Sequence, residues 1–314
     1  MNAPADPPRA VSGKPEWMRR EERGSLFWLR VMSGLSLHLG RPLSRLIVYG
    51  IALYFLLTAP AARSASRQYL NRALGRPANW LDLYRHILVF SSTIHDRLFL
   101  IRDREDVFDI QWHGDEALYA KLAEAGGLFL FGAHLGSFEI MRTLARSKSH
   151  LKICMAMYAD NARQITSTLA AINPQAMQDI IALGQLDSML TIHHKLEEGA
   201  MVGILADRAT GADRYQSVSF LGAPAHFPTG PFRMAAMLGR PVFFMVGLYR
   251  GGRCYAVHFE QIADFNGVTC EQRPAAVRAA MERYVAVLEK HCRNQPYNWF
   301  NFYDFWESGR HDQA

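Results

Sequence analysis

Short apolar runs alternate with amphipathic stretches from about residue 112 onward. Apolar runs of this length predict β-strands, and the amphipathic stretches between them predict helices. The expected strands cover residues 127–133, 151–158, 179–183, 201–206 and 242–249, and the expected helices cover 138–146, 161–172, 188–198 and 231–238. Because each crossover contains a helix, we expect a mostly parallel sheet flanked by helices in an α/β fold.

The pattern changes towards the C-terminus. Apolar residues 242–249 and 254–261 flank Arg250-Gly251-Gly252-Arg253, which predicts an antiparallel hairpin at the far edge of the sheet. A long helix is expected from Pro274 to about Arg293, followed by the aromatic segment YNWFNFYDFW. These aromatic side chains are equally suited to packing on the sheet and to a membrane interface.

Residues 16–110 have apolar positions at helical spacing, so we expect this region to be entirely helical after a disordered leader over residues 1–15. Between Arg45 and Arg63 lie 17 consecutive uncharged residues, LIVYGIALYFLLTAPAA. This run, residues 46–62, is at the short limit for a membrane span. We expect a membrane-embedded segment here, either spanning or lying in the plane of the membrane, and a buried helix of a soluble protein is the alternative.

Composition narrows the function only slightly. With 49% hydrophobic residues in a chain of 314, a disordered protein is excluded. The net charge of +6 suits anionic lipid, an acidic carrier or nucleic acid, but no nucleic-acid recognition motif accompanies the spread arginines, so no nucleic-acid partner is expected. Four widely scattered cysteines and a polar, proline-rich start predict reduced, buried thiols in a protein that is not exported.

The segment GAHLGSFEI carries the main chemical signal. His134 ends an apolar strand, and Glu139 follows a Leu135-Gly136-Ser137 turn at the start of a helix. The carboxyl edge of an open α/β sheet is where ligands bind, and a strand–turn–helix can bring both side chains together. A carboxylate bonded to one imidazole nitrogen fixes the tautomer, so the other nitrogen can take a proton from a hydroxyl. We therefore predict that His134 is a general base oriented by Glu139.

Two other patterns are weaker. Ser137 lacks the glycine two residues later that a hydrolase nucleophile elbow requires, because that position is Glu139, and a helix N-cap is the better interpretation. His193 and His194 are adjacent and face different directions on a helix, so no metal site is expected there.

The histidine, four intervening residues and glutamate after an apolar strand resemble the His-x4-Asp/Glu motif of the lysophospholipid-acyltransferase-like superfamily. The surrounding GAHLGSFEI resembles its form in the bacterial lipid A biosynthesis (late) acyltransferases. Residues 204–211 (ILADRATG), 219–235 (SFLGAPAHFPTGPFRMA) and Tyr297-Asn298-Trp299 are similar to further blocks of that family in order and spacing. The resemblance covers roughly residues 20–306.

This resemblance implies a glycerolipid-acyltransferase-like α/β domain over residues 111–306, between the helical region at 16–110 and a tail at 307–314. It implies transfer of a fatty acyl chain from an acyl-carrier-protein or coenzyme A thioester to a hydroxyl of a lipid A precursor or related lipid. No metal or organic cofactor is implied. The implied location is the cytoplasmic face of a bacterial inner membrane.

The resemblance also implies substrate contacts for two further groups of residues. Asp207 and Arg208 follow the expected strand at 201–206, and Gly222, Pro224 and Gly230 lie in the block at 219–235. The glycines would supply backbone geometry near the acyl or phosphate group. Arg163, after MYADNA, is a candidate for anion recognition, since a guanidinium can bind phosphate with two hydrogen bonds.

The chain departs from the family at two places. Arg208 stands where the family commonly has Gln, and Phe300-Asn301-Phe302 stands where it usually has a basic residue or histidine. Both positions are associated with the acceptor end. An acceptor other than lipid A, such as an amino-acid lipid or a polyene-type product, is therefore an alternative, and so is a lipid hydrolase or thioesterase using the same dyad.

Overall fold

The computed structural model describes residues 26–102, 104–140, 151–158, 180–184, 187–208 and 214–306. The first of these ranges is helical, with α2 (Leu26–Thr58), α3 (Pro60–Leu74) and α4 (Trp80–Ile101), and the short 3-10 helix η1 (Glu105–Val107) follows. α2 bends at Gly40, whose φ of 72° is not helical. α4 begins at a capping box in which the side chains of Asn79 and Asp82 each accept from the other residue's backbone N–H.

Seven strands form one sheet in the order β1-β9-β8-β2-β5-β3-β4. They are β1 (Asp109–His113), β2 (Leu128–Gly132), β3 (Ile153–Tyr158), β4 (Ile180–Leu183), β5 (Met201–Leu205), β8 (Pro241–Gly251) and β9 (Cys254–Asp264). The strands from β8 to β4 in this order are parallel, and β9 is antiparallel to β8 and parallel to β1. The predicted mostly parallel sheet and the antiparallel hairpin are confirmed, but the hairpin is not at the edge of the sheet, because β1 pairs with β9 and forms that edge.

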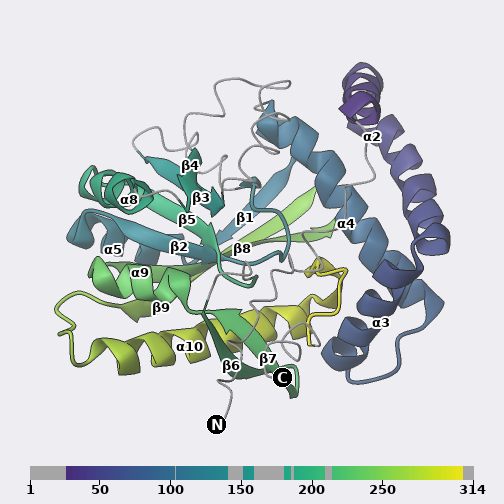
Figure 1. The fold of residues 1–314 in the computed structure, drawn as a ribbon. Helices are drawn as coiled ribbons and strands as arrows, with labels where there is room; N and C mark the ends of the chain where they lie inside the picture. Colours follow the sequence, from purple (N-terminus) through teal and green to yellow (C-terminus); the bar gives the residue numbers. More distant parts are fainter. Residues whose placement is uncertain are drawn as a thin grey trace, which may run out of the picture.

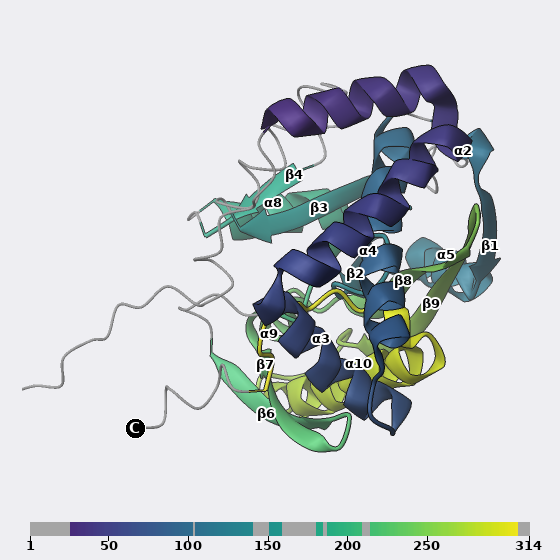
Figure 2. The same ribbon diagram turned by 90° about the vertical axis from the view of Figure 1, so that its right-hand side faces the viewer.

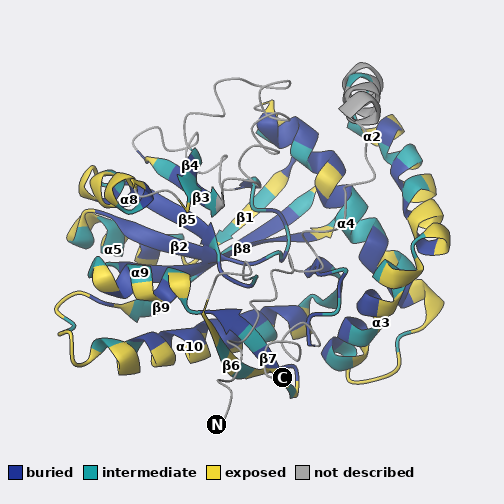
Figure 3. Cartoon of the chain, in the orientation of Figure 1, coloured by how far each residue is buried: buried dark blue, intermediate teal, exposed yellow. Residues whose placement is uncertain are grey.

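Helices cover both faces of the sheet (Figure 1): α5 (Asp115–Ala125), α8 (Ser188–Glu197), α9 (Gly230–Met237) and α10 (Arg273–Asn294). In the central strand β2, Phe129 and Phe131 join the core with α10, whereas Leu128 and Leu130 join a second core with α5. A strand buried on both faces has no polar side, which explains its continuous apolar run. Figure 3 shows the buried sheet in dark blue between partly exposed helices.

Three strands differ from the sequence prediction. β1 lies at the end of the stretch expected to be helical, and β6 (Tyr215–Phe220) and β7 (Ala223–Pro228) form a separate two-stranded hairpin. β1 and most of β6 alternate exposed with half-buried positions, so their apolar signal is weak. The hairpin turn uses positive φ at Leu221 (50°) and Gly222 (79°), as a two-residue turn requires.

Several expectations fall on other parts of the chain. The expected helix at 161–172, with Arg163, and most of the expected helix at 138–146 lie outside the described residues. The four cysteines are free, as expected, but Cys270 is exposed and Cys254 half-buried rather than all four being buried.

Within the described residues, one helical segment, Gly40–Thr58, is long and apolar enough to cross a membrane, and 22% of it is buried. The uncharged run at 46–62 is not one helix, because α2 ends at Thr58 and α3 begins at Pro60. Figure 2 shows this part of α2 lying along the outside of the molecule, over α4.

Candidate active site

The ends of two neighbouring parallel strands bring His134 and Asp207 together. In the pairing of β2 with β5, Gly132 lies opposite Leu205. His134 and Asp207 each follow two residues later, so they emerge level at the carboxyl edge of the sheet. Nδ1 of His134 lies 2.8 Å from Oδ1 of Asp207, and the backbone N–H of His134 donates to Oδ2 at 3.0 Å.

Asp207 is fully buried and held as an anion by its surroundings. Besides His134, the indole Nε1 of Trp299 and the amide Nδ2 of Asn301 donate to its Oδ2, at 3.2 and 3.3 Å. Burial acts to raise the pKa of Asp207, but the charge and hydrogen bonds of His134, together with Arg208, outweigh burial and hold the pKa at about 2. The carboxylate therefore accepts hydrogen bonds and donates none.

The tautomer of His134 follows from this contact. Because Asp207 can only accept, Nδ1 of His134 carries the proton, and the lone pair of the neutral ring lies on Nε2. Burial, assisted by the positive charge of Arg208, lowers the pKa of His134 against the opposing effect of Asp207. The side chain of His134 is 30% exposed, so this neutral imidazole is accessible from solvent.

The C-terminal tail is joined to the turn that carries His134. The N–H of Phe300 donates to the carbonyl of His134 at 2.7 Å, and the N–H of Gly136 donates to the carbonyl of Asn298 at 2.8 Å. Most of the tail aromatics, which suited either packing or a membrane interface, are packed inside, with exposures of 8% or less at Trp299, Phe300, Tyr303, Phe305 and Trp306, and Phe302 is half-buried. The tail is therefore a structural part of the site.

Arg208, which follows β5, contacts the same tail segment. Its Nε donates to Oδ1 of Asn301 at 2.6 Å, its Nη2 donates to the carbonyl of Phe300 at 2.9 Å, and its guanidinium lies 5.3 Å from the ring centre of Tyr303. The two departures from the family pattern, Arg208 and Asn301, thus contact each other. Together they fix one positive charge beside the imidazole.

Glu139 has a different partner from the one expected. Its Oε1 lies 2.6 Å from Nη2 of Arg97 on α4, and the side chains are 13% and 27% exposed. The place beside Nδ1 of His134 is held by Asp207, because the pairing of β2 with β5 sets the two strand ends level. Residue spacing along the chain does not show which strands pair, and it gave no sign of the roles of Trp299 and Asn301.

The remaining predicted substrate residues lie in a neighbouring element. Gly222 is in the β6–β7 turn, Pro224 is on β7, and Gly230 begins α9. Among the described residues, no hydrogen bond or ion pair joins them to His134. The hairpin reaches the site indirectly, because the ring of Phe220 packs against Trp299 at 5.2 Å between centroids.

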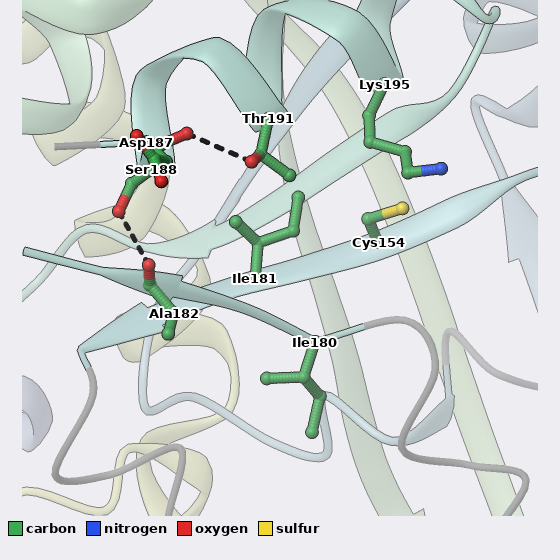
Figure 4. Close-up of a pocket in the computed structure, with 8 residues that line it drawn as sticks. All are labelled: Cys154, Ile180, Ile181, Ala182, Asp187, Ser188, Thr191 and Lys195. Atoms are coloured by element: carbon green, nitrogen blue, oxygen red, sulfur yellow. Dashed lines mark hydrogen bonds between the residues drawn. The ribbon is translucent and has the colours of Figure 1, made fainter. Parts of the chain in front are cut away.

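A small pocket of about 210 Å³ lies elsewhere, between β3, β4 and α8 (Figure 4). Its lining includes Cys154, Ile181, Ser188 and Lys195 and none of the predicted site residues. This volume is below that of ordinary ligand pockets, so the pocket is a weaker candidate for the substrate site than the strand ends at His134 and Asp207. In the described part of the chain, no group of three or more His, Cys, Asp or Glu side chains could hold a metal ion.

Comparison with known proteins identifies a family. A family model described as bacterial lipid A biosynthesis acyltransferase matches residues 91–308, a range that contains the whole sheet, His134, Asp207 and the C-terminal tail. No curated protein matches the chain.

Proposed function

Because the chain belongs to the bacterial lipid A biosynthesis acyltransferase family and is an acyltransferase, we propose that it moves a fatty acyl chain from an acyl-carrier-protein or coenzyme A thioester to a hydroxyl of a lipid acceptor. We propose that it does so at the cytoplasmic face of a bacterial inner membrane. The observation that carries the proposal is the 2.8 Å contact between His134 Nδ1 and Asp207 Oδ1, which leaves Nε2 available as a base.

In the proposed reaction, Nε2 of His134 takes the proton of the acceptor hydroxyl as its oxygen attacks the thioester carbonyl. The new C–O bond forms, the C–S bond breaks, and the proton passes from the imidazolium to the departing thiolate. Asp207 stabilises the imidazolium while it exists and holds the ring in the required tautomer. No metal and no acyl-enzyme is needed in this sequence.

Glu139 is proposed as the second carboxylate of the site. Two roles are compatible with its position: it orients the imidazole during the reaction, as the motif implies, or its ion pair with Arg97 holds the 134–140 turn against α4. Asp207 already occupies Nδ1, which favours the second role. The experiment below separates the two.

The charge at Arg208 supports an acceptor with an anionic group near the reacting hydroxyl. A guanidinium fixed beside the base is suited to a phosphate or carboxylate. A lipid A precursor meets this requirement, and so does a related acidic glycolipid or an amino-acid lipid.

Arg163, Gly222, Pro224 and Gly230 are kept as proposed substrate-site residues. The three hairpin and α9 residues are supported by the packing of Phe220 on Trp299, which couples the hairpin to the ring that donates to Asp207. A bound acyl chain near the hairpin would thereby contact the same unit that positions the dyad.

The test is an acyl-transfer assay with purified full-length protein, labelled acyl-carrier-protein and acyl coenzyme A donors, and total bacterial lipid or lipid A precursor as acceptor. We expect His134→Ala and Asp207→Asn each to lower the rate by about 10²- to 10⁴-fold, because the base is removed or left in the wrong tautomer. Glu139→Gln is compared with both. Mass spectrometry of the product identifies the acceptor.

The outcomes discriminate between the proposals. If Glu139→Gln abolishes transfer and Asp207→Asn is close to wild type, Glu139 is the orienting acid and our assignment of Asp207 is wrong. If free fatty acid is the only product of the wild type, the protein is a hydrolase or thioesterase. If all variants transfer equally, His134 is not the base.

A further inference from the structure

The outer side of α2 is apolar between Gly40 and Thr58. A buried stripe at four-residue spacing faces inward and consists of Ser44, Val48, Ala52 and Leu56. On the other sides, large apolar side chains keep 40–66% of their full exposure: Leu43, Leu46, Tyr49, Leu53, Tyr54, Phe55 and Leu57. Soluble monomers rarely expose so many neighbouring apolar side chains, so this surface, here called the α2 outer face, requires a partner.

Between Gly40 and Thr58, α2 packs against α4 and the core of the α/β domain along its whole length. Near its start, Arg41 Nε lies 2.8 Å from Oδ1 of the fully buried Asp96 on α4. In its middle, the hydroxyl of Tyr84 on α4 donates to the carbonyl of Tyr49 at 3.3 Å. Near its end, Leu56 belongs to the main core of the sheet. A bilayer cannot surround a helix that is packed against a globular unit in this way.

Gly40–Thr58 reaches the length of a membrane span only when Arg41 and Arg45 are included, and the uncharged part of this segment is short for a span. It runs from residue 46, after Arg45, to the end of the helix at Thr58. These residues form about 20 Å of helix, whereas the hydrocarbon core of a bilayer is about 30 Å thick. The chain then breaks at Ala59 and continues in α3, which contains Arg63 and Arg67.

The charges around the α2 outer face match an anionic lipid surface. Residues 41–95 contain seven arginines and one acidic residue, Asp82, so their net charge is +6, equal to that of the whole chain. Asp82 is buried and paired with Arg76. A half-exposed Trp80 lies at the end of this face, with the guanidinium groups of Arg63 and Arg67 at 5.4 and 5.8 Å from its ring centre. Tryptophan beside arginine is typical of the headgroup layer.

We propose that α2 is an in-plane docking helix: the α2 outer face inserts into one leaflet of a bilayer containing anionic phospholipid, and Trp80 with its two arginines lies among the headgroups. α4 separates α2 from the tail that holds Asp207, since Nε2 of His86 on α4 lies 2.7 Å from the carbonyl of Trp299. Docking therefore places the dyad one helix layer from the bilayer surface. Only this last consequence rests on the proposed function.

Binding is tested by flotation of the full chain with vesicles of phosphatidylethanolamine and phosphatidylglycerol. We expect the triple variant Leu46→Glu, Leu53→Glu and Leu57→Glu to bind at least ~10-fold more weakly, because three inserted side chains become charged. The matched control is Leu190→Glu with Met237→Glu, whose side chains are 72% and 58% exposed on other helices, and it should bind as wild type does. Vesicles of phosphatidylcholine alone should bind less.

Equal binding by the triple variant and the control overturns the proposal. So does a triple variant whose only change, measured by sedimentation, is the loss of a dimer, because a second copy of the chain would then be the partner of this face.

Orientation is tested by cysteine labelling in inside-out inner-membrane vesicles. Pro42→Cys and Ala61→Cys are exposed positions at the two ends of the segment, and the natural exposed Cys270 reports the side of the catalytic unit. An impermeant maleimide should label all three from one side. Labelling of the two ends from opposite sides means that the helix spans the membrane, and the proposal fails.

Docking and catalysis are measured separately. The triple variant should retain acyl transfer to detergent-dispersed acceptor, whereas His134→Ala should dock normally and be inactive. A wild-type protein that binds the vesicles but transfers no acyl chain would contradict the proposed function. The docking proposal would still hold in that case.

Discussion

The carboxylate of Asp207 accepts hydrogen bonds from the imidazole and backbone of His134, the indole of Trp299 and the amide of Asn301. A buried carboxylate with this many donors stays ionised across the whole range of physiological pH. The acid–base behaviour of the site is therefore that of His134, whose pKa is set by burial and by two fixed charges, Arg208 and Asp207.

Arg208 contributes to the low pKa of His134, so removing its charge should raise that pKa. In Arg208→Gln, the acid limb of the pH profile of kcat/KM is expected to move to higher pH, because the protonated, inactive ring persists further up the scale. Arg208→Lys keeps the charge and should keep the limb near its wild-type position. An unchanged limb in Arg208→Gln would show that the titrating group is not His134.

Trp299 is expected to act as a positioning residue through its N–H donor to Asp207. Trp299→Phe should lower kcat by about tenfold with little change in KM for the donor, and should reduce the free energy of unfolding by about 1–3 kcal/mol, measured by urea titration. Trp306→Phe is the matched control, because the Trp306 indole N–H is buried without a hydrogen-bond partner in the described structure. Equal kcat effects in both variants would remove the positioning role.

At the scale of elements, the turn after β2 is pressed against β8. The N–H of Ser137 donates to the carbonyl of Gly247 at 2.8 Å, and a Cβ at Gly136 would lie 2.1 Å from that carbonyl oxygen. Glycine at 136 is thus required both by its φ of 70° and by the contact with the neighbouring backbone.

Gly136→Ala should therefore cost about 3–5 kcal/mol of folding free energy, or prevent folding, because backbone must move. Gly222→Ala tests φ alone, since its φ is 79° and nothing lies within 4 Å of the added Cβ. Its expected cost is about 1–2 kcal/mol. Urea unfolding of both variants measures the difference, and similar costs would mean that the contact with Gly247 is relieved without strain.

The N-terminal helices are fixed by a buried ion pair. Arg41→Ala leaves the carboxylate of Asp96 with three partners: Arg45 at 3.7 Å, Nδ1 of His95 at 3.6 Å and the hydroxyl of Tyr255 at 3.0 Å. We expect a loss of about 3 kcal/mol in stability and faster proteolysis within α2, because a buried charge loses its main partner. Arg104→Ala, which breaks an exposed pair with Asp106, should change neither measurement.

At the scale of the molecule, α4 and the C-terminal tail lie between the α2 outer face and the His134–Asp207 site. α2 packs on α4, and α4 packs on the C-terminal tail through His86, whose pKa burial lowers to about 4. Neutral His86 donates through Nε2 to the carbonyl of Trp299 and accepts at Nδ1 from Ser66 of α3. Helices α3 and α4 thus pack on the tail that supports the dyad, and the family match over residues 91–308 covers this tail and the C-terminal part of α4.

The sequence by itself determined most of the sheet. The apolar runs of β2, β3, β5 and β8, the β8–β9 hairpin and the long helix α10 follow from periods of two and 3.6 residues, which are properties of neighbouring positions. β1 and the β6–β7 hairpin did not follow, because their exposed positions break the apolar pattern. The segment around His134, with the later blocks, was sufficient to predict the family that the match over residues 91–308 then confirmed.

Only the tertiary structure decided which groups meet. Asp207 lies 73 residues from His134, and the contact exists because β5, rather than β3, pairs with β2. Several strands are equally apolar, so local patterns do not show which strands are neighbours in the sheet. The pairs Glu139 with Arg97 and Arg208 with Asn301 depend on the same long-range packing, and for this reason spacing along the chain could not reveal them.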